Sequence, residues 1–222
     1  MGCGKTYGVI LFDLDGTLTD PKSGITRSVR YALEHIGVTA PDLDALTCFI
    51  GPPLRQSFTR YYGFDAEQAQ QAVAFYREYF SDQGIYENAV YPGIAGLLAR
   101  LMRGGCQLAV ATSKPEVYAR RILEHFALDG YIAQIEGSNL DLTRSDKAEI
   151  IAEVLAAYPG VDRSAIVMVG DREHDVLGAR ANQIDAIGVT YGYGSLAELR
   201  AAGATAFAAS VDALSLLLEP RD

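Results

Sequence analysis

The sequence contains no long hydrophobic run and little positive charge. It has no stretch of about 18 or more consecutive apolar residues, the length that a transmembrane helix requires. Lys and Arg number 19 against 28 Asp and Glu, so the formal net charge is -9 at pH 7. A chain this acidic lacks the basic surface that binds nucleic acid or an anionic membrane. We therefore expect neither nucleic acid nor a membrane as a partner. An anionic substrate must be bound by a metal ion or by a few local cations.

Cysteine is also scarce. Cys3, Cys48 and Cys106 lie at wide, unrelated spacings, which fit neither a disulfide framework nor a zinc site. Free thiols are typical of a reducing compartment. The first residues show no apolar segment of the signal-peptide kind. We expect a cytoplasmic protein, and the sequence leaves both a monomer and a homodimer open.

Strand-like and helical segments alternate along most of the chain. Short runs that are apolar throughout indicate strands buried on both faces of a parallel sheet. They span 7–12, 107–111, 166–169, 186–190 and 206–209. Helical patterns span 115–126, 146–157, 174–182, 196–202 and 211–218. This alternation predicts an α/β fold with a doubly wound, Rossmann-like parallel sheet, whose ligands bind at the carboxyl ends of the strands.

One region interrupts the alternation. Residues 20–88 contain no buried-strand run and instead carry three or four amphipathic helical patterns. These patterns span 26–36, 43–49, 54–62 and 66–80. We expect a small α-helical cap domain at 20–88, inserted into a catalytic core made of 1–19 and 89–222. The turn-forming residues Tyr91-Pro92-Gly93 suit its boundary.

Carboxylates follow the first and third of the predicted strands. Asp13 and Asp15 are two residues apart in an extended segment, so both can face one pocket, and Gly16 permits a sharp turn after them. Two carboxylates this close do not both ionise readily without a cation. Asp171 ends another strand, and Asp175 lies one helical turn later on the same face.

Four converging aspartates form a hard, oxygen-rich site that suits Mg²⁺. A Ca²⁺ site is the competing interpretation, but the twelve-residue calcium loop pattern is absent. Thr112 and Ser113 precede a helix N-terminus, where a hydroxyl and free N–H groups bind anions. Lys147 lies in the first turn of a helix, where the macrodipole disfavours a cation, which indicates a local role for its charge.

In order along the chain, these residues resemble the four motifs of the haloacid dehalogenase superfamily. The matching residues are Asp13-Leu14-Asp15-Gly16-Thr17, Thr112, Lys147 and Gly170-Asp171 with Asp175. The helical insertion resembles the cap of the phosphoglycolate phosphatase-like subgroup, and Gly51-Pro52-Pro53-Leu54 resembles its substrate-specificity loop. The resemblance implies a Mg²⁺-dependent phosphomonoesterase that hydrolyses a small phosphorylated metabolite.

The resemblance also implies a role for each residue. Asp13 would attack phosphorus and form a phosphoaspartyl intermediate, and Asp15 would act as general acid and then as general base. Mg²⁺ would bind Asp13, the Asp15 backbone carbonyl and Asp171, with Asp175 supporting it directly or through water. Thr112 and Lys147 would hold the phosphoryl oxygens during catalysis. The implied substrate-binding residues are Gly16, Thr112, Ser113, Lys147 and, from the cap, Arg55.

The substrate stays open at this stage. Many phosphoglycolate phosphatases carry the catalytic lysine in a Lys-Pro-x-Pro setting, whereas here Ser145-Asp146 precede Lys147 and Ala148 follows it. A 5′-nucleotide monophosphate is therefore a candidate beside 2-phosphoglycolate. A sugar-phosphate mutase similar to β-phosphoglucomutase would share every core residue and differ in the cap. A catalytically silent binding protein is the non-enzyme alternative.

Overall fold

The computed structural model describes residues 6–141 and 144–219 and divides the chain into two compact units. One unit comprises 1–19 and 90–222, and the other comprises 20–89. Cys48 and Cys106 are free thiols, whereas Cys3 lies outside the described residues. No helix of the described part is long and apolar enough to cross a membrane.

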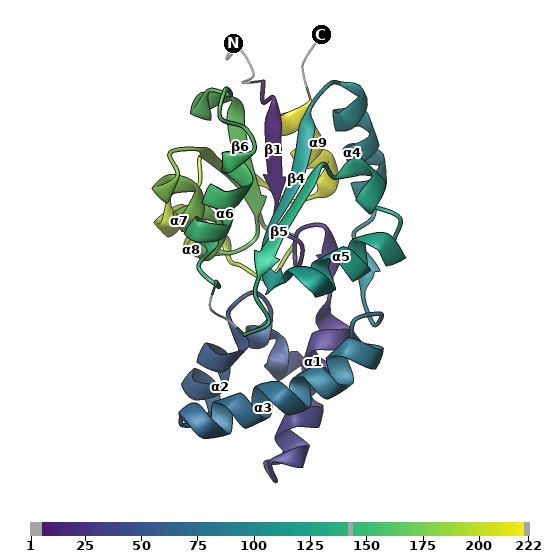
Figure 1. The fold of residues 1–222 in the computed structure, drawn as a ribbon, viewed down its shortest axis with the longest axis vertical. Helices are drawn as coiled ribbons and strands as arrows, with labels where there is room; N and C mark the ends of the chain where they lie inside the picture. The colour runs from purple at the N-terminus through teal and green to yellow at the C-terminus, as the bar shows by residue number, and fades with distance from the viewer. Residues whose placement is uncertain (1–5, 142–143, 220–222) are drawn as a thin grey trace. The chain divides into compact units, whose positions relative to one another are not determined.

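The larger unit is built on a six-stranded, wholly parallel sheet in the order β5-β4-β1-β6-β7-β8 (Figure 1). The strands are β1 (Val9–Phe12), β4 (Gln107–Pro115), β5 (Gln134–Ser138), β6 (Ile166–Gly170), β7 (Asp185–Val189) and β8 (Ala206–Ala208). The chain first runs outward from β1 to β4 and β5, then returns to β6 on the other side of β1. Ligands of such sheets bind where the direction reverses, at the carboxyl ends of the strands.

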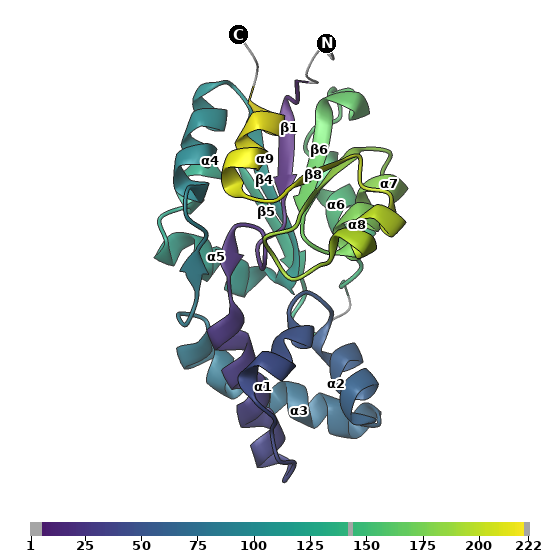
Figure 2. The ribbon, with the colours of Figure 1, turned by 180° about the vertical axis from the view of Figure 1, so that it is seen from behind.

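Helices cover both faces of the sheet (Figures 1 and 2). One face carries α4 (Ile94–Arg103), α5 (Glu116–His125) and α9 (Val211–Leu218). The other carries α6 (Lys147–Ala156), α7 (Glu173–Ala181) and α8 (Leu196–Ala202). This arrangement confirms the predicted doubly wound, Rossmann-like core.

Burial on both faces explains why the central strands are apolar throughout. Every residue of β1 is buried. Val9 and Leu11 belong to a core cluster that includes Ile150 and Val154 of α6. In a strand, alternate residues point to opposite faces, so Ile10 and the last residue of β1 serve the other side of the sheet. Packing on both faces therefore fixes the position of β1 and of the residue at which it ends.

Two elements of the larger unit were not expected from the sequence. β5 has only one aliphatic side chain, Ile135, in its sequence QIEGS, because it lies at the edge of the sheet and is only partly buried. α4 buries Ile94, Leu97, Leu98 and Leu101 along one side, a clear helical spacing within a segment to which no element was assigned.

The smaller unit, 20–89, is helical. It contains α1 (Lys22–His35), α2 (Leu54–Tyr62) and α3 (Ala66–Tyr79), with a 3₁₀ segment at Leu43–Phe49 and a π-helical turn at Phe80–Gly84. Asp65 and Gln68 form a reciprocal capping box at the start of α3. Gly24 of α1 packs so closely on the Gly84 carbonyl that a Cβ atom would overlap it. The helical patterns of the sequence are thus present, although the one at 43–49 adopts the tighter 3₁₀ geometry.

The chain passes between the two units through a pair of very short strands. β2 (Thr19–Asp20) leads into the helical unit, and β3 (Ala89–Val90) leads out of it. These two strands form their own two-stranded sheet. The insertion therefore begins and ends at neighbouring points of the backbone.

Candidate active site

The segment after β1 forms a tight loop that begins with Asp13. The Gly16 amide donates to the Thr19 carbonyl at 2.8 Å, and Gly16 adopts a φ of 83°, in the left-handed region that favours glycine. A Cβ atom at Gly16 would overlap Asp171 Oδ2. Glycine is therefore needed both for the turn and for the close approach of β6 to this loop.

Three aspartates meet at the carboxyl edge of the sheet. Asp13, Asp171 and Asp175 each place a carboxylate oxygen within 4.8 Å of the others, and all three side chains are buried. Burial, reinforced by Asp175 and Asp13, raises the pKa of Asp171 well above its usual range. Burial also raises the pKa of Asp175 to about 6, against the opposing effect of Lys147. The cluster thus carries a concentration of negative charge that a cation would relieve.

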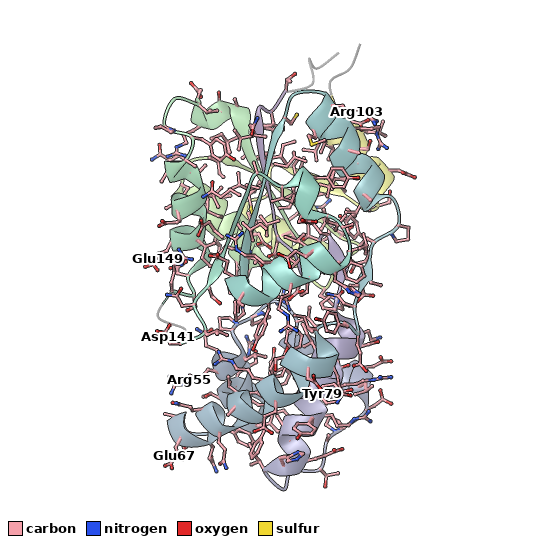
Figure 3. All side chains as sticks on the ribbon, turned by 45° about the vertical axis from the view of Figure 1, so that its right-hand side comes forward. Arg55, Glu67, Tyr79, Arg103, Asp141 and Glu149 are labelled. Carbon is pink, nitrogen blue, oxygen red and sulfur yellow. The ribbon has the colours of Figure 1, made fainter. Side chains whose placement is uncertain are left out.

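Lys147 supplies one buried cation to this cluster. Its Nζ donates to Asp13 Oδ1 at 2.9 Å and to the Ala111 carbonyl at 2.8 Å, and it pairs with Asp175 Oδ1 at 2.8 Å. Burial lowers the pKa of Lys147, but the two carboxylates outweigh that effect and keep the pKa above its ordinary value. Glu149, two residues later on α6, is exposed and points outward (Figure 3). The first turn of α6 therefore holds a protonated lysine against the Asp13 carboxylate.

Asp15 lies close by, but its carboxylate is not part of the three-aspartate group. Its Oδ2 forms an ion pair with Lys114 Nζ at 2.7 Å, and the Lys114 side chain is 5% exposed. Burial raises the pKa of Asp15, and Lys114 opposes this shift. Asp15 Oδ1 is buried without a hydrogen-bond partner among the described residues. Lys114 was not among the expected site residues, since the sequence alone does not show which way its side chain turns.

The end of β4 carries the other polar residues of the site. Thr112 is buried, and its Oγ1 accepts a hydrogen bond from the Lys114 amide at 3.3 Å. Ser113 is half-buried. The pairing of β4 with β5 shifts register between Thr112 and Pro115, so the strand bulges where these side chains emerge.

A second loop, at 190–195, was not expected from the sequence either. The Tyr193 amide donates to Asp171 Oδ2 at 2.7 Å. Gly192 and Gly194 approach Asp171 so closely that a Cβ atom on either would clash with it. Two glycines flanking a tyrosine, shortly after a strand, are the signal that could have revealed this loop. It fixes one oxygen of Asp171 and leaves Oδ1 buried with no hydrogen-bond partner in the described part of the chain.

Arg55 lies in the helical unit and is exposed. Its Nη2 donates to Gln70 Oε1 at 3.2 Å and to the Ala66 carbonyl at 3.4 Å. Arg55 and Glu67, both labelled in Figure 3, line a depression of that unit. These contacts place Arg55 against α3, and its expected contact with substrate stays a prediction.

Comparison with known proteins finds relatives over nearly the whole chain. A 5′-nucleotidase of Pseudomonas aeruginosa is 52% identical over 213 residues, which are 96% of this chain and 96% of the relative. A phosphoglycolate phosphatase of Agrobacterium fabrum is 32% identical, over 82% of this chain and 80% of the relative. The solved structure of Protein Tyrosine Kinase A of Mycobacterium tuberculosis matches with a TM-score of 0.82 and 41% identity, covering 94% and 96% of the two chains.

The family assignment rests on the match across the core. The model of the haloacid dehalogenase-like hydrolases matches residues 10–189, which include the loop after β1, Thr112, Lys147 and Asp175. The resemblance noted in the sequence is thereby confirmed. The chain belongs to the haloacid dehalogenase-like hydrolase family, and it is an enzyme of the phosphatase class.

Proposed function

We propose that the protein is a Mg²⁺-dependent phosphomonoesterase that transfers the phosphoryl group of a small metabolite to Asp13 and then to water. The observation that carries the proposal is the position of the Asp13 carboxylate, which touches the buried Lys147 ammonium and lies within 4.8 Å of Asp171 and Asp175. A carboxylate that attacks a phosphate anion needs positive charge nearby to offset the repulsion between them.

In the first step, an oxygen of the Asp13 carboxylate forms a bond to phosphorus. The bond between phosphorus and the ester oxygen breaks, and its electron pair stays on that oxygen. Asp15 supplies a proton to that oxygen as the bond breaks, so that the product leaves as a neutral alcohol. Lys147 holds the nucleophile in place, because its Nζ donates to Asp13 Oδ1 at 2.9 Å.

In the second step, water hydrolyses the phosphoaspartyl group. The water oxygen bonds to phosphorus, its proton passes to Asp15, and the bond between phosphorus and the Asp13 oxygen breaks. Inorganic phosphate leaves, and both carboxylates return to their starting protonation. Splitting the reaction in two requires Asp15 to act first as acid and then as base. Burial favours such a proton-accepting role because it raises the pKa of Asp15.

The residues present fit a divalent cation. Asp171 Oδ1 is buried without a hydrogen-bond partner in the described residues, and three carboxylates converge beside it. Hard oxygen donors of this kind suit Mg²⁺. The carboxylates of Asp13, Asp171 and Asp175, with the Asp15 backbone carbonyl, would hold the ion. When bound, it would neutralise the charge of the phosphoryl oxygens and of the carboxylate cluster.

For the substrate, we favour a 5′-nucleotide monophosphate over 2-phosphoglycolate, since the more similar of the two phosphatase relatives is a 5′-nucleotidase. The departure from the Lys-Pro-x-Pro setting around Lys147 agrees with this choice. Arg55 is proposed as a contact from the cap to the part of the substrate that does not react. Neither phosphatase relative supports the mutase alternative, and we do not favour it.

The test is release of inorganic phosphate from a panel of 5′-nucleotides, 2-phosphoglycolate and para-nitrophenyl phosphate, with and without Mg²⁺. Wild-type protein should release phosphate only with the metal, and Asp13→Asn should abolish turnover. Asp185→Asn is the matched control. Asp185 lies at the amino end of β7, away from the carboxyl ends of the strands, and accepts a hydrogen bond from Tyr7. Normal turnover by Asp13→Asn would exclude Asp13 as the nucleophile, and silence of the wild type on every substrate would reject the proposed function.

A further inference from the structure

Lys114 is a buried cation with no role in the reaction described above. Its side chain is 5% exposed, and its Nζ lies 2.7 Å from Asp15 Oδ2. Removing an ammonium group from water is costly unless a partner compensates it. Its position therefore depends on the carboxylate that we propose as the general acid and base.

The backbone turns Lys114 toward this site through a bulge in β4. Thr112 pairs with Gly137, but the next pair along is Pro115 with Ser138. Ser113 and Lys114 are thus extra residues on the β4 side, and such bulges re-aim side chains beside active sites. A Cβ atom on Gly137 would lie 2.6 Å from the Lys114 carbonyl oxygen, so glycine there lets the bulge pack against β5.

The ion pair makes the two oxygens of Asp15 unequal. Oδ2 is occupied by Lys114, whereas Oδ1 is buried with no hydrogen-bond partner in the described residues. A carboxylate held by one oxygen keeps the other in a fixed direction. We propose that Lys114 is a positioning residue that holds Asp15 Oδ2, so that Oδ1 is the atom that gives and takes the proton.

This inference rests on the proposed role of Asp15. In the first step the proton moves from Asp15 Oδ1 to the ester oxygen as the bond to phosphorus breaks. In the second it moves from water to Oδ1 as the phosphoaspartyl bond breaks. Lys114 keeps its own protons in both steps and touches no reacting atom, so its removal should affect only those steps that need the proton.

Leaving groups of different acidity separate this role from others. A nitrophenolate is a good leaving group and needs no proton. An alkoxide is a poor leaving group and must be protonated as it departs, so kcat/KM for an alkyl phosphate depends on the general acid. Lys114→Met should lower kcat/KM for an alkyl phosphate by roughly 10–100-fold. It should change kcat/KM for para-nitrophenyl phosphate by less than about 3-fold, since that ratio reports only the steps up to loss of the alcohol. Arg100→Met on α4 is the matched control. It breaks an ion pair with Glu219, at the end of α9, and should leave both ratios unchanged.

A double variant shows whether Lys114 acts through Asp15. Asp15→Asn alone and Asp15→Asn with Lys114→Met should have the same kcat/KM on para-nitrophenyl phosphate, because the lysine has no carboxylate left to position. Asp15→Asn leaves Lys114 an amide oxygen as acceptor, and the double variant carries neither buried charge, so the comparison decides the matter even if Lys114→Met fails to fold.

Two results would overturn the inference. One is an equal loss on alkyl and aryl substrates in Lys114→Met. The other is a further loss in the double variant, which would mean that Lys114 binds the phosphoryl group directly. A wild-type protein that hydrolyses neither substrate would instead reject the proposed function itself.

Discussion

Replacing Asp171 by Asn should raise stability and remove activity at the same time. In the metal-free protein the carboxylate faces Asp13 and Asp175, and oxygen atoms of the three lie within 4.8 Å. At an effective dielectric constant of about 20, two unit charges 4.8 Å apart repel by roughly 3 kcal/mol. Lys147 contacts Asp13 and Asp175, but the ion pairs of the described residues give it no contact with Asp171. An amide of the same shape can accept from Tyr193 and donate to a carboxylate.

We expect Asp171→Asn to increase the free energy of unfolding of the metal-free protein by about 1–3 kcal/mol at neutral pH, since Lys147 and solvent offset part of the repulsion. For a chain of this size, about 1 kcal/mol moves Tm by roughly 2–4 °C. The pKa of Asp171 is raised in the folded state, so its anion destabilises the fold above that pKa and ceases to do so as the pH falls through it. The advantage of the variant should therefore shrink in acid.

Thermal melts in a chelator, across a pH series, measure this difference. Adding Mg²⁺ should raise the Tm of the wild type, because an ion that binds only the folded state stabilises it, and should raise that of Asp171→Asn much less. Asp185→Asn should respond to Mg²⁺ as the wild type does. A metal-free Asp171→Asn protein that melts below the wild type at neutral pH would refute the reasoning, since the carboxylate would then stabilise the fold on balance.

Three other substitutions test the local geometry. Gly16→Ala should cost about 1–3 kcal/mol of stability, because the φ of Gly16 is positive, and thermal melts measure this loss. It should also lower kcat by more than about 10-fold, because the added Cβ would displace Asp171, and phosphate release measures that effect. Gly24→Ala should destabilise the helical unit by about 1–3 kcal/mol through overlap with the Gly84 carbonyl, and unchanged protease resistance of that unit would contradict this. Arg55→Ala should raise KM for the preferred substrate with little change in kcat, and an unchanged KM would remove Arg55 from the binding site.

Local pattern was sufficient to predict five of the six strands of the sheet and the places where Asp13 and Asp171 follow two of them. β1 and β6 are apolar throughout because they are buried on both faces, and Asp13 and Asp171 follow where these strands end. Since parallel strands end at one edge, their meeting follows from topology. The edge strand β5 was missed because its half-buried positions permit the polar residues Gln134 and Glu136, so its apolar signal is weak.

The contacts of the site depend on bends that sequence patterns do not record. Lys114 reaches Asp15 only because β4 bulges after Thr112. Tyr193 reaches Asp171 through its backbone amide, and every residue type except proline carries that N–H group. The ion pair and the amide contact both join segments far apart in the chain. Predicting them would require the register between strands, which is set by packing across the whole core.

The passage through β2 and β3 has a consequence for how this architecture can diversify. Thr19–Asp20 and Ala89–Val90 form a small ladder of their own, so the exit and return of the inserted segment are held side by side. The register of β1 with β4 and β6 uses only residues outside that segment. A different segment whose ends met this ladder could be grafted there without disturbing the aspartates. On the proposed function, in which the helical unit contacts the substrate and the aspartates transfer the phosphoryl group, substrate preference and phosphoryl chemistry would change independently in descendants of one gene.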